Sequence, residues 1–242
     1  MKNKKHCTAI VLSAGQGKRM GTSVQKQYIE LEGKPVIFYT LKVFQDSEII
    51  DDIVLVVGKD QISYVKEEIV DFYGFDKVRT IVEGGKERYD SVWSGLRAIK
   101  AEDGYVFIHD GARLFVNEDI LRRGYETVEE FRACVAGMPS KDTVKIVDDN
   151  TFASATPNRK YVWSVQTPQI FANSLIKEAY EKIMQGDCTG VTDDAMVVEQ
   201  TMNVPVKLFE GSYENIKITT PEDLDIAKVF LKKNKKIKKS LK

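Results

Sequence analysis

The sequence predicts a single α/β domain built on a mostly parallel β-sheet. Short runs rich in Val, Ile and Leu alternate with longer amphipathic segments, which is the pattern of repeated strand–helix–strand units. The candidate strands are apolar along nearly their whole length, so helices should cover both faces of the sheet. A chain of 242 residues can bury about 70–75% of its unfolded surface and needs no disulfide or metal to hold its core.

Six apolar runs are the candidate strands: Cys7–Ser13, Ile53–Val57, Val78–Glu83, Tyr105–His109, Ala133–Met138 and Val204–Phe209. The amphipathic segments are the candidate helices: Pro35–Gln45, Gln61–Tyr73, Glu87–Lys100, Glu118–Phe131, Ser174–Met184, Asp193–Gln200 and Pro221–Lys233. Pro35 suits the first turn of its helix, where the backbone needs no N–H donor. Strands and helices therefore alternate through most of the chain.

The stretch 142–169 interrupts this alternation. Apolar and polar residues alternate around Asp148–Asn150, which predicts a hairpin, and Tyr161–Val165 is a further candidate strand. Because the stretch contains no crossover helix, we expect residues 139–170 to project from the sheet as an arm. An arm of this kind often seals a homodimer.

The chain has no net charge because a lysine-rich end offsets an acidic body. The last eleven residues contain seven lysines and no acid, which leaves 29 basic and 36 acidic residues in the rest of the chain. We interpret 1–231 as one domain and 232–242 as a frayed, solvated tail, since the acidic body offers no matching basic face. An arm that binds nucleic acid or a membrane is the alternative interpretation of the tail.

Several other classes of protein are excluded. The longest apolar runs are far shorter than the ~20 residues that span a bilayer, and the basic start is not followed by a secretory apolar segment. The three cysteines lie far apart in sequence, and with two histidines they match no common zinc-binding spacing. We therefore expect a cytoplasmic protein that binds neither membranes nor nucleic acid.

The strongest local signal is AIVLSAGQGKRMG at residues 9–21, which predicts an anion site. Gly15, Gly17 and Gly21 allow the backbone to turn tightly and to point several N–H groups at one anion. Three cations accompany these glycines: Lys18, Arg19 and Lys26. The combination suits a triphosphate, whose charge must be screened before a nucleophile approaches. A plain polar turn is the alternative, although it leaves the cations unexplained.

Two familiar glycine-rich motifs do not fit this loop. The loop lacks the GxxxxGK[ST] spacing, and Met20 stands where GxGxxG requires its third glycine. A dinucleotide-binding fold also needs an acidic residue about 20 positions later, at the end of the second strand. That strand ends here at Val57. A nicotinamide-dependent oxidoreductase is therefore disfavoured.

A second signal is VFIHDGAR at residues 106–113. Asp110 follows a buried strand, at the edge where open α/β sheets bind their ligands. A single carboxylate there suits Mg²⁺, which takes one or two carboxylates together with substrate phosphates and water. A helix-capping or turn residue is an equally good interpretation of Asp110. We interpret His109 as a packed strand residue, since no serine or cysteine nucleophile lies near it in sequence.

Weaker signals occur elsewhere in the chain. GGKERYDSV at 84–92 places Arg88 and Ser91 at the start of a helix, where backbone and hydroxyl groups could bind a nucleobase or a ribose. The predicted arm carries a hydroxyl and two cations that could hold a second phosphate: Thr143, Lys145 and Arg159. An ordinary strand–turn–helix junction and a solvated hairpin are the alternatives. Thr192 and Lys217 carry no signal of their own.

Eight sequence strings point to one family when they are taken together and in order: AGQGKRMG, VQKQY, GGKERYDSV, HDGAR, DTVK, QTPQIF, TDDA and NIKITTPEDL. With them the chain resembles the 2-C-methyl-D-erythritol 4-phosphate cytidylyltransferases of the non-mevalonate isoprenoid pathway, over nearly its whole length. The resemblance implies a Rossmann-like nucleotidyltransferase fold and a homodimer. It also implies that CTP and methylerythritol phosphate give 4-diphosphocytidyl-2-C-methyl-D-erythritol and pyrophosphate, with Mg²⁺ as cofactor.

The resemblance assigns roles to individual residues. Those that match the family's catalytic cations are Arg19, Lys26 and Lys217. Those that match positions around the cytidine nucleotide are Ala14, Gly15, Gly17, Gly85 and Ser91. Those tied to the methylerythritol phosphate are Asp110, Arg113, Thr143, Arg159 and Thr192. Asp110 also matches the acid associated with the metal, and Thr143 and Arg159 are expected to reach in from the partner's arm.

The chain departs from the family pattern at two positions. Gln25 and Leu114 stand where the family usually has proline, and this change frees φ and restores a backbone donor in two loops.

Two alternatives to the methylerythritol enzyme also stay open. A ribitol 5-phosphate cytidylyltransferase shares the loop and the arm, although HDGAR and DTVK look closer to the methylerythritol branch. The other is a non-catalytic nucleotide- or nucleic-acid-binding module with the tail as its arm.

Overall fold

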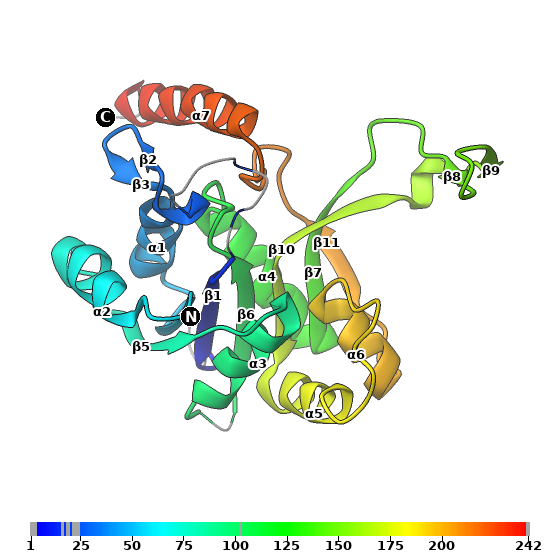
Figure 1. The fold of residues 1–242 in the computed structure, drawn as a ribbon, viewed down its shortest axis with the longest axis horizontal. Coiled ribbons are helices and arrows are strands. Elements are labelled where there is room, and N and C mark those ends of the chain that lie inside the picture. The colour runs from blue at the N-terminus through cyan, green and yellow to red at the C-terminus, as the bar shows by residue number, and fades with distance from the viewer. Residues whose placement is uncertain (1–3, 16, 18–19, 21–24, 102, 241–242) are drawn as a thin grey trace.

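A seven-stranded sheet forms the centre of the computed structural model (Figure 1), which describes residues 4–15, 17, 20, 25–101 and 103–240. Its strands lie in the order β11-β7-β10-β6-β1-β4-β5. Their bounds are β1 (Cys7–Ser13), β4 (Asp52–Val57), β5 (Val78–Glu83), β6 (Tyr105–Asp110), β7 (Ala133–Pro139), β10 (Trp163–Ala172) and β11 (Lys207–Glu210). All run parallel except β10, which is antiparallel to β6 and β7. The predicted mostly parallel sheet is confirmed.

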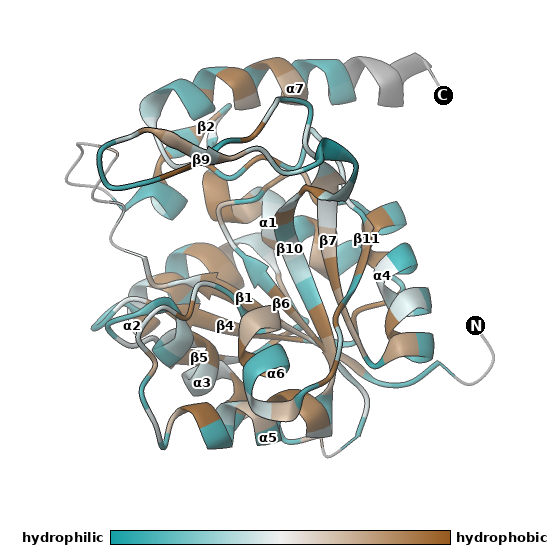
Figure 2. Cartoon of the chain, turned by 90° about the vertical axis from the view of Figure 1, so that its right-hand side faces the viewer, coloured by the Kyte–Doolittle hydropathy of each residue, from teal (hydrophilic) through white to brown (hydrophobic). Residues whose placement is uncertain are grey.

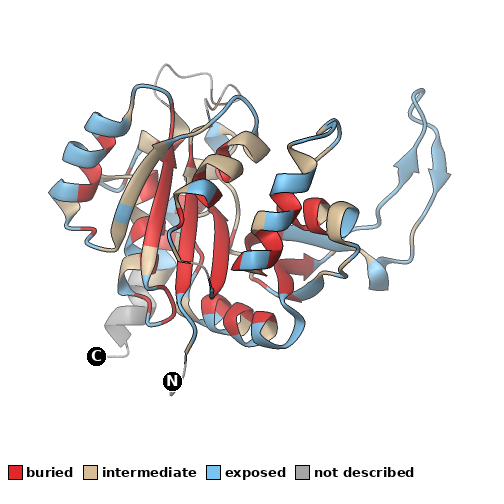
Figure 3. Ribbon diagram, turned by 90° about the horizontal axis from the view of Figure 1, so that it is seen from below, coloured by how far each residue is buried: buried red, intermediate tan, exposed pale blue. Residues whose placement is uncertain are grey.

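Helices cover both faces of the sheet, as the apolar strands predict. Neighbouring residues of β1 point to opposite faces, so that Ala9 belongs to one buried cluster and Ile10 to the other. The first face is covered by α1 (Val36–Asp46), α2 (Ile62–Val65), the π-helical turn η3 (Lys66–Asp71) and α4 (Glu118–Phe131). The second is covered by α3 (Arg88–Ala98), α5 (Asn173–Ile183) and α6 (Asp194–Met202). The helices alternate between hydrophobic and hydrophilic residues (Figure 2), and buried strands lie between them (Figure 3).

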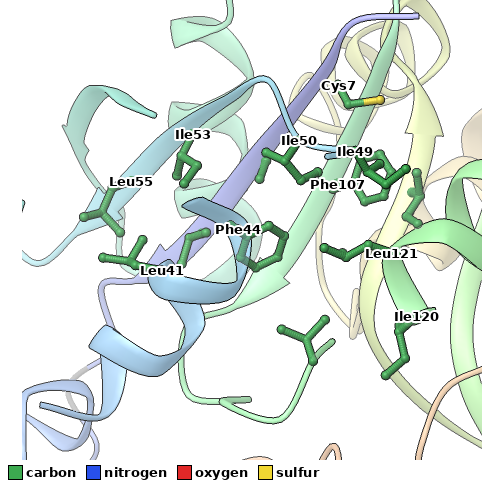
Figure 4. Close-up of a cluster of buried hydrophobic side chains, with 14 of the residues drawn as sticks. Cys7, Leu41, Phe44, Ile49, Ile50, Ile53, Leu55, Phe107, Ile120 and Leu121 are labelled. Carbon is green, nitrogen blue, oxygen red and sulfur yellow. The ribbon is translucent and has the colours of Figure 1, made fainter. Parts of the chain in front are cut away.

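The core beneath α1 and α4 consists of large aliphatic and aromatic side chains (Figure 4). Leu41 and Phe44 of α1 and Leu121 of α4 pack over the sheet, in one cluster with Ile53 and Phe107. All five side chains are fully buried, and burying a side chain of this size contributes about 1.5–3 kcal/mol. The amphipathic pattern that predicts these helices therefore corresponds to their packed faces.

A further helix, α7 (Pro221–Ser240), lies beside the small hairpin of β2 (Glu30–Leu31) and β3 (Lys34–Pro35) (Figure 1). Its inward face packs against the loop that follows β6, where the ring centroids of Phe115 and Phe230 are 5.3 Å apart. This third buried cluster therefore holds the loop that comes directly after Asp110.

An arm projects beyond the ends of β7 and β10 (Figures 1 and 3). It contains two short strands, β8 (Ile146–Val147) and β9 (Ala153–Ala155), and the 3-10 turn η4 (Arg159–Tyr161). Apolar side chains on the arm are exposed, with Phe152 at 73% and Tyr161 at 75%. The predicted hairpin is therefore present, and it carries apolar surface that its own chain does not cover.

Several predicted boundaries differ from the observed ones, and three of them lie near prolines and turns. The strand expected at Val204 begins only at Lys207, because Pro205 cannot donate to the ladder. Tyr161 belongs to η4, so the strand expected over Tyr161–Val165 begins two residues later as β10. This strand continues to Ala172 within the central sheet, so the expectation that residues 139–170 all project as an arm is wrong for the part in β10. Pro35 caps α1 from the preceding position instead of lying in its first turn.

The lysine-rich end is helical where the sequence predicts a frayed tail. The helix α7 continues through Ser240, well past the expected end at Lys233. Lysine is a good helix former, and neither glycine nor proline interrupts residues 222–240. Within the part of the chain that the structure describes, no helix combines the length and apolarity needed to span a membrane.

Candidate active site

A cleft of about 900 Å³ opens at the carboxyl ends of β1, β4, β5 and β6. After β1 the chain builds β4 and β5 on one side of that strand and then crosses to β6 on the other. Such a reversal separates the loops above the sheet and leaves room for a ligand. Five cationic and three acidic side chains line the described part of the cleft, a net charge of +2. The cleft therefore favours an anionic ligand.

The loop after β1 supplies one wall of the cleft. Its described lining residues are Ala14, Gly15 and Gly17. Gly17 has a φ of +65°, a conformation that favours glycine. The loop is braced from the 3-10 turn η2 (Lys26–Tyr28), where the Gln27 amide donates to the carbonyl oxygens of Ser13 at 2.6 Å and Gly15 at 3.1 Å. Gln27 therefore fixes the backbone on which an anion would rest.

The turn between β5 and α3 supplies another wall. A Cβ atom on Gly84 would lie 2.6 Å from Oγ of Ser91, and one on Gly85 would collide with Asp90. The Ser91 hydroxyl accepts from the Gly85 N–H at 3.2 Å and donates to the Glu87 carbonyl at 3.2 Å. Only glycines fit this turn, so its backbone is open to a ligand in the cleft.

Asp110 ends β6 as a buried carboxylate surrounded by cations. Its Oδ2 lies 2.8 Å from Nζ of Lys217 and 4.0 Å from Nε of Arg113, and its Oδ1 lies 3.4 Å from Nε of Arg88. Burial by itself would raise the pKa of the Asp110 carboxyl, but Arg88, Lys217 and Arg113 outweigh burial and hold the pKa well below its usual range. Asp110 is therefore ionised at every physiological pH.

The segment before α7 carries Lys217 into the cleft. Nζ of Lys26 donates to the carbonyl of Ile218 at 2.8 Å. Asn215 is fully buried, and its amide donates to the carbonyl of Thr167 at 2.9 Å. These bonds fix both ends of the short stretch that bears Lys217, so Lys26 of η2 and Lys217 are held next to each other at the cleft.

His109 is packed beneath this site as a neutral side chain. Its Nε2 lies 3.0 Å from the Arg113 carbonyl, and its Nδ1 lies 3.1 Å from the Thr167 hydroxyl. That hydroxyl accepts the backbone N–H of Asp110 at 3.1 Å and so donates its own proton to Nδ1, which leaves the ring proton on Nε2. Burial lowers the pKa of His109 to about 4. The expected packed role of His109 agrees with these contacts.

Most of the residues singled out from the sequence meet in this one cleft. The lining includes Ala14, Gly15, Gly17, Lys26, Gly85, Ser91, Asp110 and Lys217. Arg113 is largely buried beside it, where NH1 donates to the carbonyl of Asn215 at 2.8 Å. Arg113 therefore influences the cleft through its contact with the Asp110 carboxylate.

Besides Arg113, three described residues predicted for the site are not among the lining residues. Thr143 and Arg159 belong to the arm, where NH1 of Arg159 donates to the Lys141 carbonyl at 2.9 Å. Thr192 precedes α6, and its hydroxyl contacts the sulfur of Met196 at 3.7 Å. Arg19 lies outside the described residues. A single chain therefore does not bring the two arm residues to its own cleft.

The two departures from the family's prolines have structural explanations. Gln25 has a φ of −62°, close to the value that proline imposes. Leu114 is buried in the cluster beneath α7, together with Phe115. Gln25 therefore keeps the backbone conformation that proline would impose, and Leu114 fills its position in the core without a proline ring.

Asp110 is the described residue best suited to hold a divalent cation. The described part of the chain contains no group of three or more His, Cys, Asp or Glu side chains that could enclose a metal. Oδ1 of Asp110 accepts a long contact of 3.4 Å from Arg88, and an ionised carboxylate oxygen can accept a second partner. This donor fits Mg²⁺ in a site completed by substrate phosphates and water.

Some residues that shape the site give no clear signal in the sequence. Gln27 is a polar residue that is only 2% exposed, yet glutamine in a loop string is usually a surface residue. Asp194 is fully buried and paired with Arg88, 106 positions away. Thr167 stands in the string QTPQIF, whose polar residues do not indicate which distant residues they will contact. Partners this distant cannot be assigned from one sequence.

The fold and the cleft define a nucleotidyltransferase. A Rossmann-like sheet presents a glycine-rich loop, a strand-end carboxylate and several cations at one edge, an arrangement that binds polyphosphates and needs no side-chain nucleophile. The model of the 2-C-methyl-D-erythritol 4-phosphate cytidylyltransferase family matches residues 7–233. The chain belongs to this family.

Individual relatives and solved structures agree with this assignment. The cytidylyltransferase of Lachnospira eligens is 54% identical over 226 residues, which cover 93% of this chain and 99% of that one. The enzyme of Lachnoclostridium phytofermentans is 51% identical over 94% of this chain and 97% of its own. The crystal structure of the Anaerococcus prevotii 4-diphosphocytidyl-2C-methyl-D-erythritol synthase has a TM-score of 0.84 at 35% identity, with 95% and 97% of the two chains covered. The ribitol phosphate alternative is not favoured.

Proposed function

We propose that the cleft binds CTP beside 2-C-methyl-D-erythritol 4-phosphate and joins the two, with release of pyrophosphate. The family's reaction yields 4-diphosphocytidyl-2-C-methyl-D-erythritol, a precursor in isoprenoid synthesis. One observation carries the assignment of this reaction to the cleft: a buried, ionised Asp110 among three cations, in the same cavity as the glycine-rich loop.

In this proposal the chain supplies position and charge rather than a covalent intermediate. An oxygen of the acceptor phosphate attacks the α-phosphorus of CTP, and the bond to the leaving pyrophosphate breaks. The attacking phosphate is already anionic, so the step needs no protein nucleophile and no general base. Arg19, Lys26 and Lys217 stabilise the charge that develops at the α-phosphorus.

Backbone groups at the glycines hold the nucleotide in this proposal. Ala14, Gly15 and Gly17 offer N–H groups to the triphosphate, as glycine-rich nests do elsewhere. Gly85 and Ser91 face the cytidine. The tight turn at Gly84 and Gly85 supports this role because a side chain at either position would strike a neighbour.

Asp110 would hold the Mg²⁺ ion that the family generally requires. When bound, the ion would neutralise charge on the phosphates of CTP. Asp110 itself would keep one oxygen on Lys217, 2.8 Å away, and thereby hold that lysine at the reacting phosphates. The depressed pKa of Asp110 supports this role, since only the ionised form can bind both a cation and Lys217.

We further propose a homodimer in which each arm completes the partner's site. Thr143 and Arg159 of one arm would bind the acceptor in the other subunit, next to that subunit's Asp110, Arg113 and Thr192. The exposed apolar side chains of the arm support this arrangement, since an apolar patch with no cover in its own chain is typical of an interface.

The cysteines of the chain are free thiols, which is consistent with work in the cytoplasm. Residues 1–231 would form the catalytic domain and 232–242 a dispensable extension.

The roles of the two lysines are tested by Lys26→Ala and Lys217→Ala, with Lys182→Ala on α5 as a matched control. Removal of one well-placed donor should lower kcat by about 10²–10³. The control lysine is about half exposed and pairs with Glu178 on the same helix, so its removal should leave turnover unchanged. A variant of either cleft lysine that keeps wild-type kcat would contradict the proposal.

A further inference from the structure

We propose that Arg88 is a positioning residue that sets the spacing between the nucleotide side and the acceptor side of the cleft. It does so by holding Asp110 and the start of α6 at a fixed distance from each other. This inference rests on the proposed function, because it takes the segment at Thr192 as part of the acceptor site.

Arg88 binds the start of α6 through a two-pronged ion pair. Its NH1 and NH2 groups lie 2.9 and 2.8 Å from Oδ1 and Oδ2 of Asp194. Asp194 is fully buried, and Tyr180 donates its hydroxyl to Oδ1 at 2.6 Å. The carboxylate therefore accepts three hydrogen bonds, which fix its position and the plane of the guanidinium.

The remaining edge of the same guanidinium faces the reaction site. Nε lies 3.4 Å from Oδ1 of Asp110, and the side chain lines the cleft. Burial disfavours a cation here, but Asp194 and Asp110 outweigh burial and raise the pKa of Arg88 well above its usual value. Arg88 therefore stays charged and bridges the two carboxylates.

Both partners of the Arg88–Asp194 ion pair belong to segments that the proposed function assigns to substrates. Arg88 begins α3, three residues after Gly85 in the nucleotide turn. Asp194 begins α6, two residues after Thr192. The side chain of Gln169 in β10 ties this end of α6 to the sheet, since its Oε1 accepts from the Asp194 N–H at 3.0 Å. A displacement of Arg88 would therefore move the two substrate segments relative to each other.

A lysine cannot replace Arg88 in this bridge. The guanidinium fork matches one carboxylate with two parallel hydrogen bonds while Nε points to another, whereas an ammonium group is a compact point charge. A misplacement of about 1 Å between reacting groups can cost on the order of 10²-fold in rate. Loss of the fork should therefore impair use of the acceptor and spare the binding of CTP, which the glycine-rich walls hold.

The test compares Arg88→Lys, Asp194→Asn and the double variant with the wild-type enzyme. CTP binding is measured by calorimetry without acceptor, and acceptor kinetics by pyrophosphate release at saturating CTP. We expect kcat/KM for methylerythritol phosphate to fall about 10²-fold in each single variant while the Kd for CTP changes by less than about 3-fold. The double variant should be no worse than the poorer single one, because the pair acts as a unit. Arg97→Lys, on the exposed side of the same helix, should match the wild type.

Two results would overturn the inference. One is wild-type acceptor kinetics in Arg88→Lys, and the other is a loss of CTP affinity in the same proportion as acceptor use, which is the behaviour of a purely structural pair. Asp194→Asn preserves the shape of its side chain and decides the question if Arg88→Lys does not fold. If the wild type and Arg97→Lys both fail to use methylerythritol phosphate, the proposed function fails instead of this inference.

Discussion

Nζ of Lys217 lies 2.8 Å from Oδ2 of Asp110, although the two residues are 107 positions apart in the chain. The carboxylate ends a central strand, and the lysine comes from the anchored segment before α7. Because both charges are already in place, the site needs little reorganisation when a polyphosphate arrives, and such preorganisation is a large part of electrostatic catalysis.

Replacement of Asp110 by Asn should abolish most of the activity. The neutral amide no longer balances Lys217, Arg88 and Arg113, and it is a poor ligand for a divalent cation. We expect kcat to fall by about 10²–10³, together with a lower Tm, because buried cations lose their counter-charge. Asp76→Asn, in an exposed turn, is the control for the change of charge. Steady-state pyrophosphate release and a thermal melt check the result, and an active Asp110→Asn enzyme would remove Asp110 from the mechanism.

A methyl group on Gly15 should block the nucleotide without disturbing the fold. Among the described residues, no atom lies within 4 Å of a Cβ placed there, and Gly15 lines the cleft. The added methyl group would therefore occupy space where the loop should approach the phosphates. Gly186→Ala is the matched control, since its Cβ would have only one neighbour, at 3.7 Å, outside the cleft. Both variants should melt like the wild type, and Gly15→Ala alone should weaken CTP binding, by about tenfold or more. Equal CTP affinity in the two variants would contradict a phosphate site at Gly15.

Shared sites predict complementation between inactive chains. In a mixed dimer of Lys217→Ala and Arg159→Ala subunits, one site carries both defects and the other carries neither, so the mixed dimer should regain half of the wild-type turnover. A mixture of Lys26→Ala and Lys217→Ala should stay inactive, because every site keeps one damaged lysine. No recovery in the first mixture after verified subunit exchange would refute the contribution of Arg159 from the partner.

The buried neutral His109 should make the fold less stable in mild acid. In the folded chain the pKa of His109 is about 4, against the usual value of 6.5. Below pH 6.5 the unfolded chain binds a proton that the folded chain does not, so stability falls as pH falls and levels off near pH 4. The slope from this group is about 1.4 kcal/mol per pH unit, or roughly 3 kcal/mol over the window.

Urea unfolding at several pH values measures this effect of His109. The variant His109→Gln keeps an amide N–H that can reach the Arg113 carbonyl but carries no titrating group. Between pH 6.5 and 4, the free energy of unfolding of this variant should therefore depend less steeply on pH than that of the wild type. The difference in slope should correspond to the uptake of one proton. Identical slopes in the two proteins would mean that His109 titrates normally in the folded chain.

Much of the fold follows from local sequence signals. The bounds of β1, β5 and α4 are predicted to the residue because in each case a strong apolar pattern ends at turn or capping residues. For α4, the Asn117 side chain caps the start by accepting from the Ile120 N–H at 2.9 Å, and Arg132 ends the helix with a φ of +64°. Less reliable predictions concern segments whose ends depend on turns or on tertiary packing, such as β11 and the extension of α7.

The candidate site divides in the same way. Gly15, Gly17 and Asp110, which line the cleft, were predictable for it because a backbone nest and a strand-end carboxylate have local signatures. The pairing of Arg88 with Asp194 has none, since it forms only when α3 and α6 pack on the same face of the sheet. Long-range pairing of charges is therefore the part of the site that needs the structure.

The most direct test of the function is pyrophosphate release with each of the four ribonucleoside triphosphates, against methylerythritol phosphate and ribitol 5-phosphate, with and without Mg²⁺. We predict turnover only with CTP, methylerythritol phosphate and Mg²⁺ together. Turnover with ribitol 5-phosphate instead, or no turnover with any pair in a folded enzyme, would contradict the account.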